Sequence, residues 1–141
     1  MCLDGEERKT LSYLSYLQTE LAEKKEQLER LKNCESELDG YQVEFSQNNY
    51  LVKDPDLSAT TWKGNLAEKF TDIREDMDAA YKDISGTQLD TAITAIENKI
   101  ANIKAEIQSL QSAISAEIAR IEREEREERE REKERQKERM K

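Results

Sequence analysis

The fold is decided by residues 89–121, whose sequence is LDTAITAIENKIANIKAEIQSLQSAISAEIARI. Leucine and isoleucine recur there at steps of four and three residues, which places them on one stripe of a helix. The stripe consists of Leu89, Ile93, Ile96, Ile100, Ile103, Ile107, Leu110, Ile114 and Ile121. A stripe of this length and regularity is typical of a helix that packs against another helix, as in a coiled coil.

A second apolar stripe lies near the start of the chain, where leucines recur at steps of three, four and seven residues. It is formed by Leu11, Leu14, Leu17, Leu21, Leu28, Leu31 and Leu38. We therefore predict a first helix over about residues 4–50. The sole proline, Pro55, follows, and the residue before a proline is disfavoured in helical geometry. The sequence predicts a chain reversal over residues 52–65 and a second helix over about 66–121.

The second helix is predicted to begin with a capping box, because Asn65 is followed three residues later by Glu68. Its first apolar stripe is out of phase with the stripe that starts at Leu89. The members of this first stripe are Leu66, Phe70, Ile73, Met77 and Ile84. We expect a kink or short break near residues 85–87, at Gly86, where Thr87 and Asp90 could form a fresh capping box.

Residues 122–141 consist of Glu and Arg with few exceptions and carry no apolar face. Glu and Arg four residues apart stabilise a solvated helix, so this tail is predicted to be a single charged helix. The predicted fold class is all-α. It is a long, coiled-coil-like antiparallel two-helix hairpin over residues 1–121, with a kink near Gly86 and the charged helix of residues 122–141 as an extension.

Composition excludes several functions. The 141 residues include no histidine, 39% are charged, and the net charge is -9. An acidic chain repels phosphate, so we expect no nucleic acid partner, and no apolar run approaches the ~20 residues of a membrane span. Without histidine, a phosphate-binding loop or a metal motif, the chain is predicted not to be an enzyme and to take no cofactor or small-molecule substrate. Cys2 and Cys34 are assigned no role.

The predicted reversal contains Trp62-Lys63-Gly64 within the segment DPDLSATTWKGNLAEKF of residues 54–70. A tryptophan two residues before a glycine, between two long helices, resembles the WxG-motif superfamily of type VII secretion proteins. The segment looks closest to small helical proteins encoded beside LXG-domain polymorphic toxins in Gram-positive bacteria. The resemblance implies a secretion or turn motif at Trp62 and Gly64, with Pro55 and Phe70 beside it.

The resemblance also implies a function. The chain would be a non-enzymatic partner and targeting factor that binds the N-terminal helical domain of an LXG toxin and aids its type VII secretion. It would be cytoplasmic before export and could be secreted with its toxin. A second small helical partner or a homodimer would cover the remaining apolar surface. The predicted partner-binding stripe is Ile93, Ile96, Ile100, Ile103, Ile107, Leu110 and Ile114.

One departure from the family and two alternative functions stay open. Classical actinobacterial members of the superfamily carry YxxxD or YxxxE after the second helix, whereas Tyr81 is followed four residues later by Ser85. The toxin would then supply the missing half of the export signal. A self-associating coiled-coil scaffold would explain the heptads after Leu89, and an immunity protein for the toxin's catalytic domain would explain the acidic body.

Overall fold

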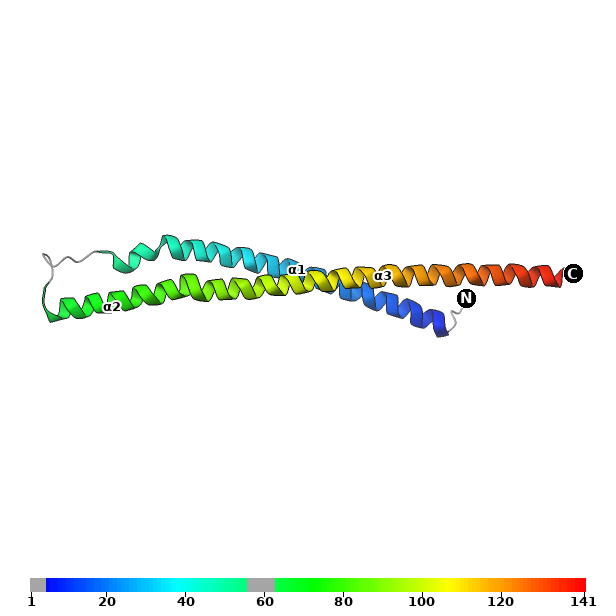
Figure 1. Cartoon of the computed structure of the whole chain (residues 1–141), viewed down its shortest axis with the longest axis horizontal. Coiled ribbons are helices and arrows are strands. Elements are labelled where there is room, and N and C mark those ends of the chain that lie inside the picture. The colour runs from blue at the N-terminus through cyan, green and yellow to red at the C-terminus, as the bar shows by residue number, and fades with distance from the viewer. Residues whose placement is uncertain (1–4, 56–62) are drawn as a thin grey trace. The chain divides into compact units, whose positions relative to one another are not determined.

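The computed structural model describes residues 5–55 and 63–141. Its elements are the helix α1 (Gly5–Gln47), the short 3-10 helix η1 (Asn49–Lys53), the helix α2 (Asn65–Lys82), the π-helix η2 (Asp83–Gln88) and the helix α3 (Leu89–Arg139) (Figure 1). No strand occurs in the described ranges. The all-α fold class predicted from the sequence is confirmed.

The chain reverses within residues 30–101, one of two compact units. The rings of Phe45 in α1 and Tyr81 in α2 have centroids 5.2 Å apart. Earlier in α1, Gln42 Nε2 donates to the carbonyl of Ser85 at 2.9 Å and to Asp90 Oδ1 at 2.6 Å. Since the partner's number falls as the α1 number rises, the two arms are antiparallel, and the predicted hairpin is confirmed.

The other unit contains residues 1–29 and 102–141. Within it, Lys24 Nζ of α1 lies 2.8 Å from Glu106 Oε2 of α3. Nearer the start of α1, Thr10 Oγ1 accepts a hydrogen bond of 3.1 Å from Arg120 Nη2. The order of these two contacts is again antiparallel.

Each unit is stabilised by a narrow apolar strip rather than by a thick core. Leu17 of α1 is buried in the unit of residues 1–29 and 102–141, together with Ile103 and Ile107 of α3. In the unit of residues 30–101, Ile93 and Ile100 are buried. Burying one such side chain stabilises a fold by roughly 1.5–3 kcal/mol, so a few isoleucines hold each helix pair together.

The disturbance predicted near Gly86 is a π-helix instead of a break. The backbone stays helical on both sides, with φ of -63° at Asp83 and -67° at Leu89. A π-helix bonds residues five apart and thereby absorbs one extra residue, which is the step from Ile84 to Leu89. The fresh capping box predicted at Thr87 and Asp90 is therefore wrong, because Thr87 lies inside η2 and the helical backbone continues from it into α3.

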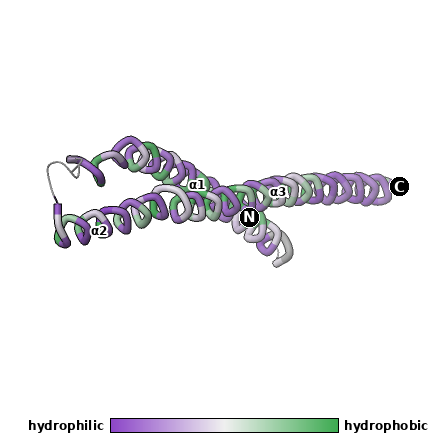
Figure 2. Tube along the Cα trace, turned by 60° about the vertical axis from the view of Figure 1, so that its left-hand side comes forward, coloured by the Kyte–Doolittle hydropathy of each residue, from purple (hydrophilic) through white to green (hydrophobic). Residues whose placement is uncertain are grey.

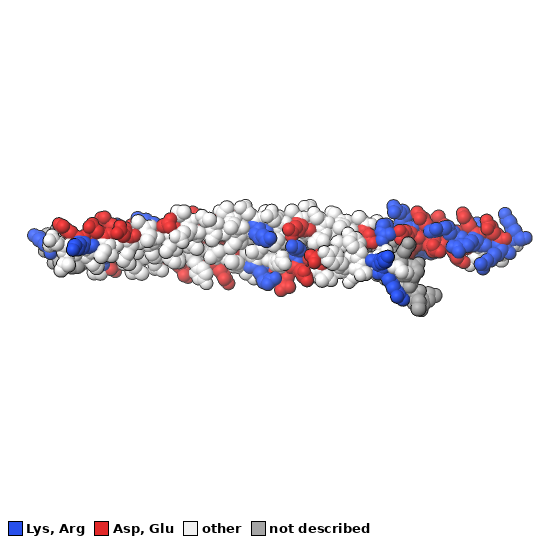
Figure 3. All heavy atoms as spheres, turned by 90° about the horizontal axis from the view of Figure 1, so that it is seen from below, with Lys and Arg blue, Asp and Glu red and all other residues white. Residues whose placement is uncertain are grey.

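Helix α3 continues through the charged tail to Arg139. Figure 2 shows the far end of α3 as uninterruptedly hydrophilic, and Figure 3 shows acidic and basic side chains interspersed over it. The ion pairs of the tail include Arg131 with Glu128 at 3.5 Å and Arg135 with Glu132 at 3.8 Å. Both join residues three apart on one helix. Among the described residues, no helix combines the length and apolar composition that a bilayer span requires.

Candidate functional site

Gly64 of the predicted turn motif is the residue that precedes α2, and its backbone has φ 108° and ψ 178°. Glycine adopts this conformation readily, whereas residues with a Cβ are strained in it. A Cβ added at Gly64 would meet no atom within 4 Å, so the requirement is conformational rather than one of space. The structure thus provides a physical reason for the glycine of the motif. Trp62 lies outside the described residues.

The capping box predicted at Asn65 and Glu68 is wrong. The residue at the N-cap is Gly64, and no side-chain hydrogen bond caps the helix. Asn65 is already the first residue of α2, whereas a capping side chain must come from the non-helical residue before it. The carbonyl of Gly64 accepts the first intrahelical bond, from the backbone N–H of Glu68 at 3.1 Å.

Pro55 and Phe70, the other two predicted motif residues, are brought together by Arg74. Arg74 Nη1 donates to the carbonyl oxygen of Pro55 and, at 3.3 Å, to that of Lys53. Its guanidinium carbon lies 4.8 Å from the centroid of the Phe70 ring, a cation–π contact. Sequence analysis missed Arg74, although its position one turn after Phe70 would have permitted this contact.

Asp78 is a second polar residue on the inner face of α2 that sequence analysis missed. It is buried, and its Oδ2 lies 2.9 Å from Lys82 Nζ and 3.9 Å from Lys53 Nζ. Lys53 therefore contacts α2 twice, through its carbonyl at Arg74 and its ammonium at Asp78. These two residues of α2 fasten the end of η1 to the second arm of the hairpin.

The apolar stripe predicted at the start of the second helix does not face the hairpin. Leu66 is 75% exposed, Ile73 and Met77 are each 55% exposed, and Ile84 is 38% exposed. We call these four residues, of which three lie in α2 and Ile84 lies just beyond it in η2, the outer stripe of α2. The inner face of α2 is formed instead by the buried or half-buried Ala67, Phe70, Arg74, Asp78 and Tyr81.

The isoleucine stripe predicted to bind a partner lies on the inner side of the helix pairs. Ile93, Ile100, Ile103 and Ile107 are buried, and Ile96, Leu110 and Ile114 are half-buried. A partner could reach these side chains only if the chain's own helices separated. Among the described residues, the exposed large apolar side chains are the outer stripe of α2 and several residues elsewhere, so a partner surface built on the closed hairpin has to use these. The latter are Leu11, Tyr13, Tyr16, Tyr41, Val43, Tyr50, Leu51, Ile118 and Met140.

Arg120 is the centre of the polar contacts in the unit of residues 1–29 and 102–141. Its Nη2 donates to Glu117 Oε1 at 2.5 Å, and its Nη1 donates to Glu124 Oε1 at 2.6 Å. The hydrogen bonds from Arg120 hold the pKa of Glu117 below its usual value, and those to Glu117 and Glu124 raise the pKa of Arg120. With Thr10 bound to the same guanidinium, the cluster links α3 to α1.

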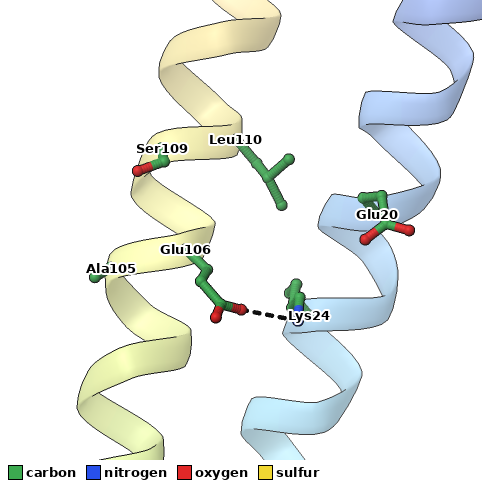
Figure 4. A pocket seen from close by; sticks show the side chains of 6 residues that line it. All are labelled: Glu20, Lys24, Ala105, Glu106, Ser109 and Leu110. Atoms are coloured by element: carbon green, nitrogen blue, oxygen red, sulfur yellow. Dashed lines mark ion pairs between the residues drawn. The ribbon is translucent and has the colours of Figure 1, made fainter.

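A shallow groove in the same unit runs between α1 and α3 beside the Lys24–Glu106 ion pair (Figure 4). Figure 4 shows Leu110 pointing from α3 toward α1, while Glu20 lines the opposite wall. The hydrogen bond and charge of Glu106 raise the pKa of Lys24, so the ammonium stays protonated. The groove offers an open ion pair, and its lining also includes Ser109. In the described ranges, no three His, Cys, Asp or Glu side chains are placed to hold a metal ion.

The Glu117 cluster predicts a pH dependence of stability. A carboxyl whose pKa is lowered by folding stabilises the native state above its ordinary value of 4.5, and this contribution is lost as the pH falls through the lower native value. We expect the Glu117→Gln variant to be less stable than the parent at neutral pH. On acidification, its free energy of unfolding should fall by less than that of the parent. Urea midpoints at about pH 7 and pH 3 measure the difference. Glu125→Gln, an exposed change in the tail, is the control and should follow the parent; an identical pH profile for Glu117→Gln would contradict the prediction.

Comparison with known proteins places these features in a family. A model of the YwqH-like family matches residues 5–125. Protein YxiB of Bacillus subtilis (strain 168) is 42% identical over 48 residues, which are 34% of this chain and 40% of YxiB. The matched part thus spans less than half of that relative's length. No solved structure matches the chain. Neither the matching family nor this relative carries the name of the WxG-motif superfamily that the turn resembles.

Proposed function

Because the chain belongs to the YwqH-like family, we propose that it is a non-enzymatic helical partner of an LXG-type toxin. It binds the N-terminal helical domain of the toxin and aids its type VII secretion. The resemblance of residues 54–70 to proteins encoded beside such toxins supports the choice of partner. The chain is then cytoplasmic before export and could leave the cell with its toxin.

The outer stripe of α2 is the observation that carries this proposal. A helix that folds only to complete its own hairpin buries its large apolar side chains and exposes its polar ones. In α2 this sorting is incomplete: Phe70 and Tyr81 are half-buried, but Arg74 and Asp78 also face inward while Leu66, Ile73 and Met77 face solvent. An ordered row of exposed apolar side chains on a highly charged protein marks an interaction surface.

Of the two alternatives, self-association through the isoleucine stripe has less support than partner binding. Ile103 in the middle of that stripe is 1% exposed within a single chain, so a second copy finds no free surface there. The immunity alternative rests on the net charge of -9, which would suit a basic catalytic domain. The immunity alternative does not explain why the outer stripe of α2 is exposed.

Co-purification tests the proposal. The chain is co-expressed with two halves of the LXG toxin from the same locus, one containing the N-terminal helical region and one the catalytic region. We expect a stable complex with the N-terminal half alone, because a helical domain can complement an exposed helical stripe. Binding to the catalytic half alone would establish the immunity alternative. A locus without an LXG gene, or failure to bind either half, would overturn the proposal.

A further inference from the structure

Helix α2 carries two different faces, separated by roughly a quarter turn at about 100° per residue. The inner face meets the other arm of the hairpin. The outer face repeats at alternating steps of four and three residues, the spacing of a coiled-coil seam. Its positions are Leu66, Phe70, Ile73, Met77, Ala80 and Ile84. Phe70 is half-buried and belongs to both faces, whereas the other five are exposed.

Exposure along the outer stripe falls toward the π-helix. It is 75% at Leu66, beside the turn, and 38% at Ile84, inside η2. From Leu89 onward the apolar residues belong to the inner side of the hairpin, as the burial of Ile93 shows. At its Ile84 end, the outer stripe therefore continues into the apolar packing of the hairpin, and at its Leu66 end it is open to solvent. A helix bound there would extend the packing that already exists.

The flank of the outer stripe that points away from the hairpin is acidic. Helical spacing places Asp72, Asp76 and Asp83 on this flank, with Lys69 as the single base among them. Within the described residues, neither Asp72 nor Asp76 forms an ion pair, and Asp83 accepts a hydrogen bond from Gln88 Nε2 at 2.8 Å. Charges beside a coiled-coil seam select the partner, because opposite charges attract across the seam and like charges repel.

From this arrangement we infer that the outer stripe of α2 docks one amphipathic helix whose apolar seam is flanked by Lys or Arg. The inference rests on the proposed function, and the helix then belongs to the toxin's N-terminal domain. Ile73 and Met77, at the centre of the stripe, are the main apolar contacts. Asp72, Asp76 and Asp83 pair with the basic flank.

A second copy of this chain complements the same surface less well than a helix with a wholly basic flank. If two α2 helices met antiparallel through their outer stripes, the centre of each stripe would oppose the centre of the other. Asp76 would then lie against Asp76 of the second copy and repel it, whereas Asp83 would lie near Lys69 of the other copy. An occupant of opposite charge meets no such repulsion.

Two synthetic peptides test the docking surface without the toxin. Each has about three heptads with the same Leu/Ile seam, one with Lys and the other with Glu at the flanking positions. Fluorescence anisotropy with the full chain should show binding of the Lys peptide at least about tenfold tighter than that of the Glu peptide. Equal affinities, or no binding of either peptide, would overturn the inference.

Variants with matched controls locate the binding. Ile73→Glu should weaken binding of the Lys peptide about 30-fold, as expected for a central apolar contact. Thr71→Glu adds the same charge at an exposed position on the other side of the helix and should change the affinity little. Asp76→Lys should lower the affinity and its salt dependence, whereas Glu75→Lys, on the opposite face, should not. Circular dichroism checks that helicity is retained. If a variant and its control lose the same peptide affinity, the outer stripe is not the binding surface.

The toxin complex separates this inference from the proposed function. If the toxin's N-terminal half binds and Ile73→Glu leaves that binding unchanged, the function stands and the docking surface is wrong. If only the Lys peptide binds, and Ile73→Glu abolishes it, the surface stands and the toxin assignment fails. Sedimentation of the chain alone should show a monomer; a dimer lost in Ile73→Glu would give the surface to a second copy and overturn the inference.

Discussion

Replacing Ile103 by glutamate is expected to unfold the helix pair formed by residues 1–29 and 102–141. Ile103 is 1% exposed, the lowest exposure among the buried residues of the described ranges. A carboxylate there would be buried without an opposite charge, and such substitutions cost about 4 kcal/mol. The milder Ile103→Ala removes packing and leaves a cavity, which costs about 2–5 kcal/mol. Urea unfolding followed by circular dichroism measures both losses.

Ile118 provides the control, since it is the same residue type in the same helix and unit but is 39% exposed. Ile118→Glu and Ile118→Ala should change the free energy of unfolding by about 0.5 kcal/mol or less. Equal losses at the two positions would show that the strip of isoleucines is not what holds α3 in place. The pairing of α1 with α3 would then have to depend on the polar contacts of Arg120 and Lys24.

Gly64→Ala is expected to destabilise the hairpin by about 1–3 kcal/mol, the cost of holding a residue with a Cβ in a strained backbone conformation. The φ of 108° at Gly64 is the only positive φ among the described residues. No neighbouring atom would oppose the added methyl group, so the whole effect comes from the backbone. Thermal and urea unfolding of the variant measure it.

The opposite sign is expected at Gly40, in the interior of α1, where an added Cβ also meets nothing within 4 Å. There the backbone is helical, so Gly40→Ala should stabilise the protein by about 0.4–1 kcal/mol through the lower entropy of the unfolded chain. If Gly64→Ala and Gly40→Ala change the free energy of unfolding in the same direction, the conformational explanation of Gly64 fails.

Under the proposed function, toxin export measured in strains that carry these variants separates a structural role of the turn from a role in recognition. If Gly64 serves only the reversal, export should fall in Gly64→Ala no further than the folded fraction falls. Trp62→Ala supplies the comparison: export lost at an unchanged melting temperature means that the tryptophan is recognised by the secretion machinery. Normal export by a well-folded Trp62→Ala variant would leave the turn without a role as a secretion motif.

Much of the fold follows from the sequence because it depends on local periodicity. The spacing of Ile93 to Ile114 makes one helical face apolar in any environment, and Pro55 disfavours helical geometry in the residue before it. The five-residue step from Ile84 to Leu89 likewise indicates a disturbance, since it departs from the steps of three and four on either side. The periodicity indicates only that this step contains one residue more than the steps of three and four on either side. Whether the helix breaks or absorbs it as a π-turn depends on the packing of the helices on both sides.

Only the tertiary structure decided which face of α2 lies inside. The sequence offers an apolar stripe through Ile73 and Met77, and a helix alone would be expected to bury it. The opposing segment instead presents the carbonyls of Lys53 and Pro55 and the ammonium of Lys53, which require a donor and an anion. Arg74 and Asp78 supply both. These polar contacts hold Arg74 and Asp78 on the inner side of α2, and the apolar stripe stays exposed.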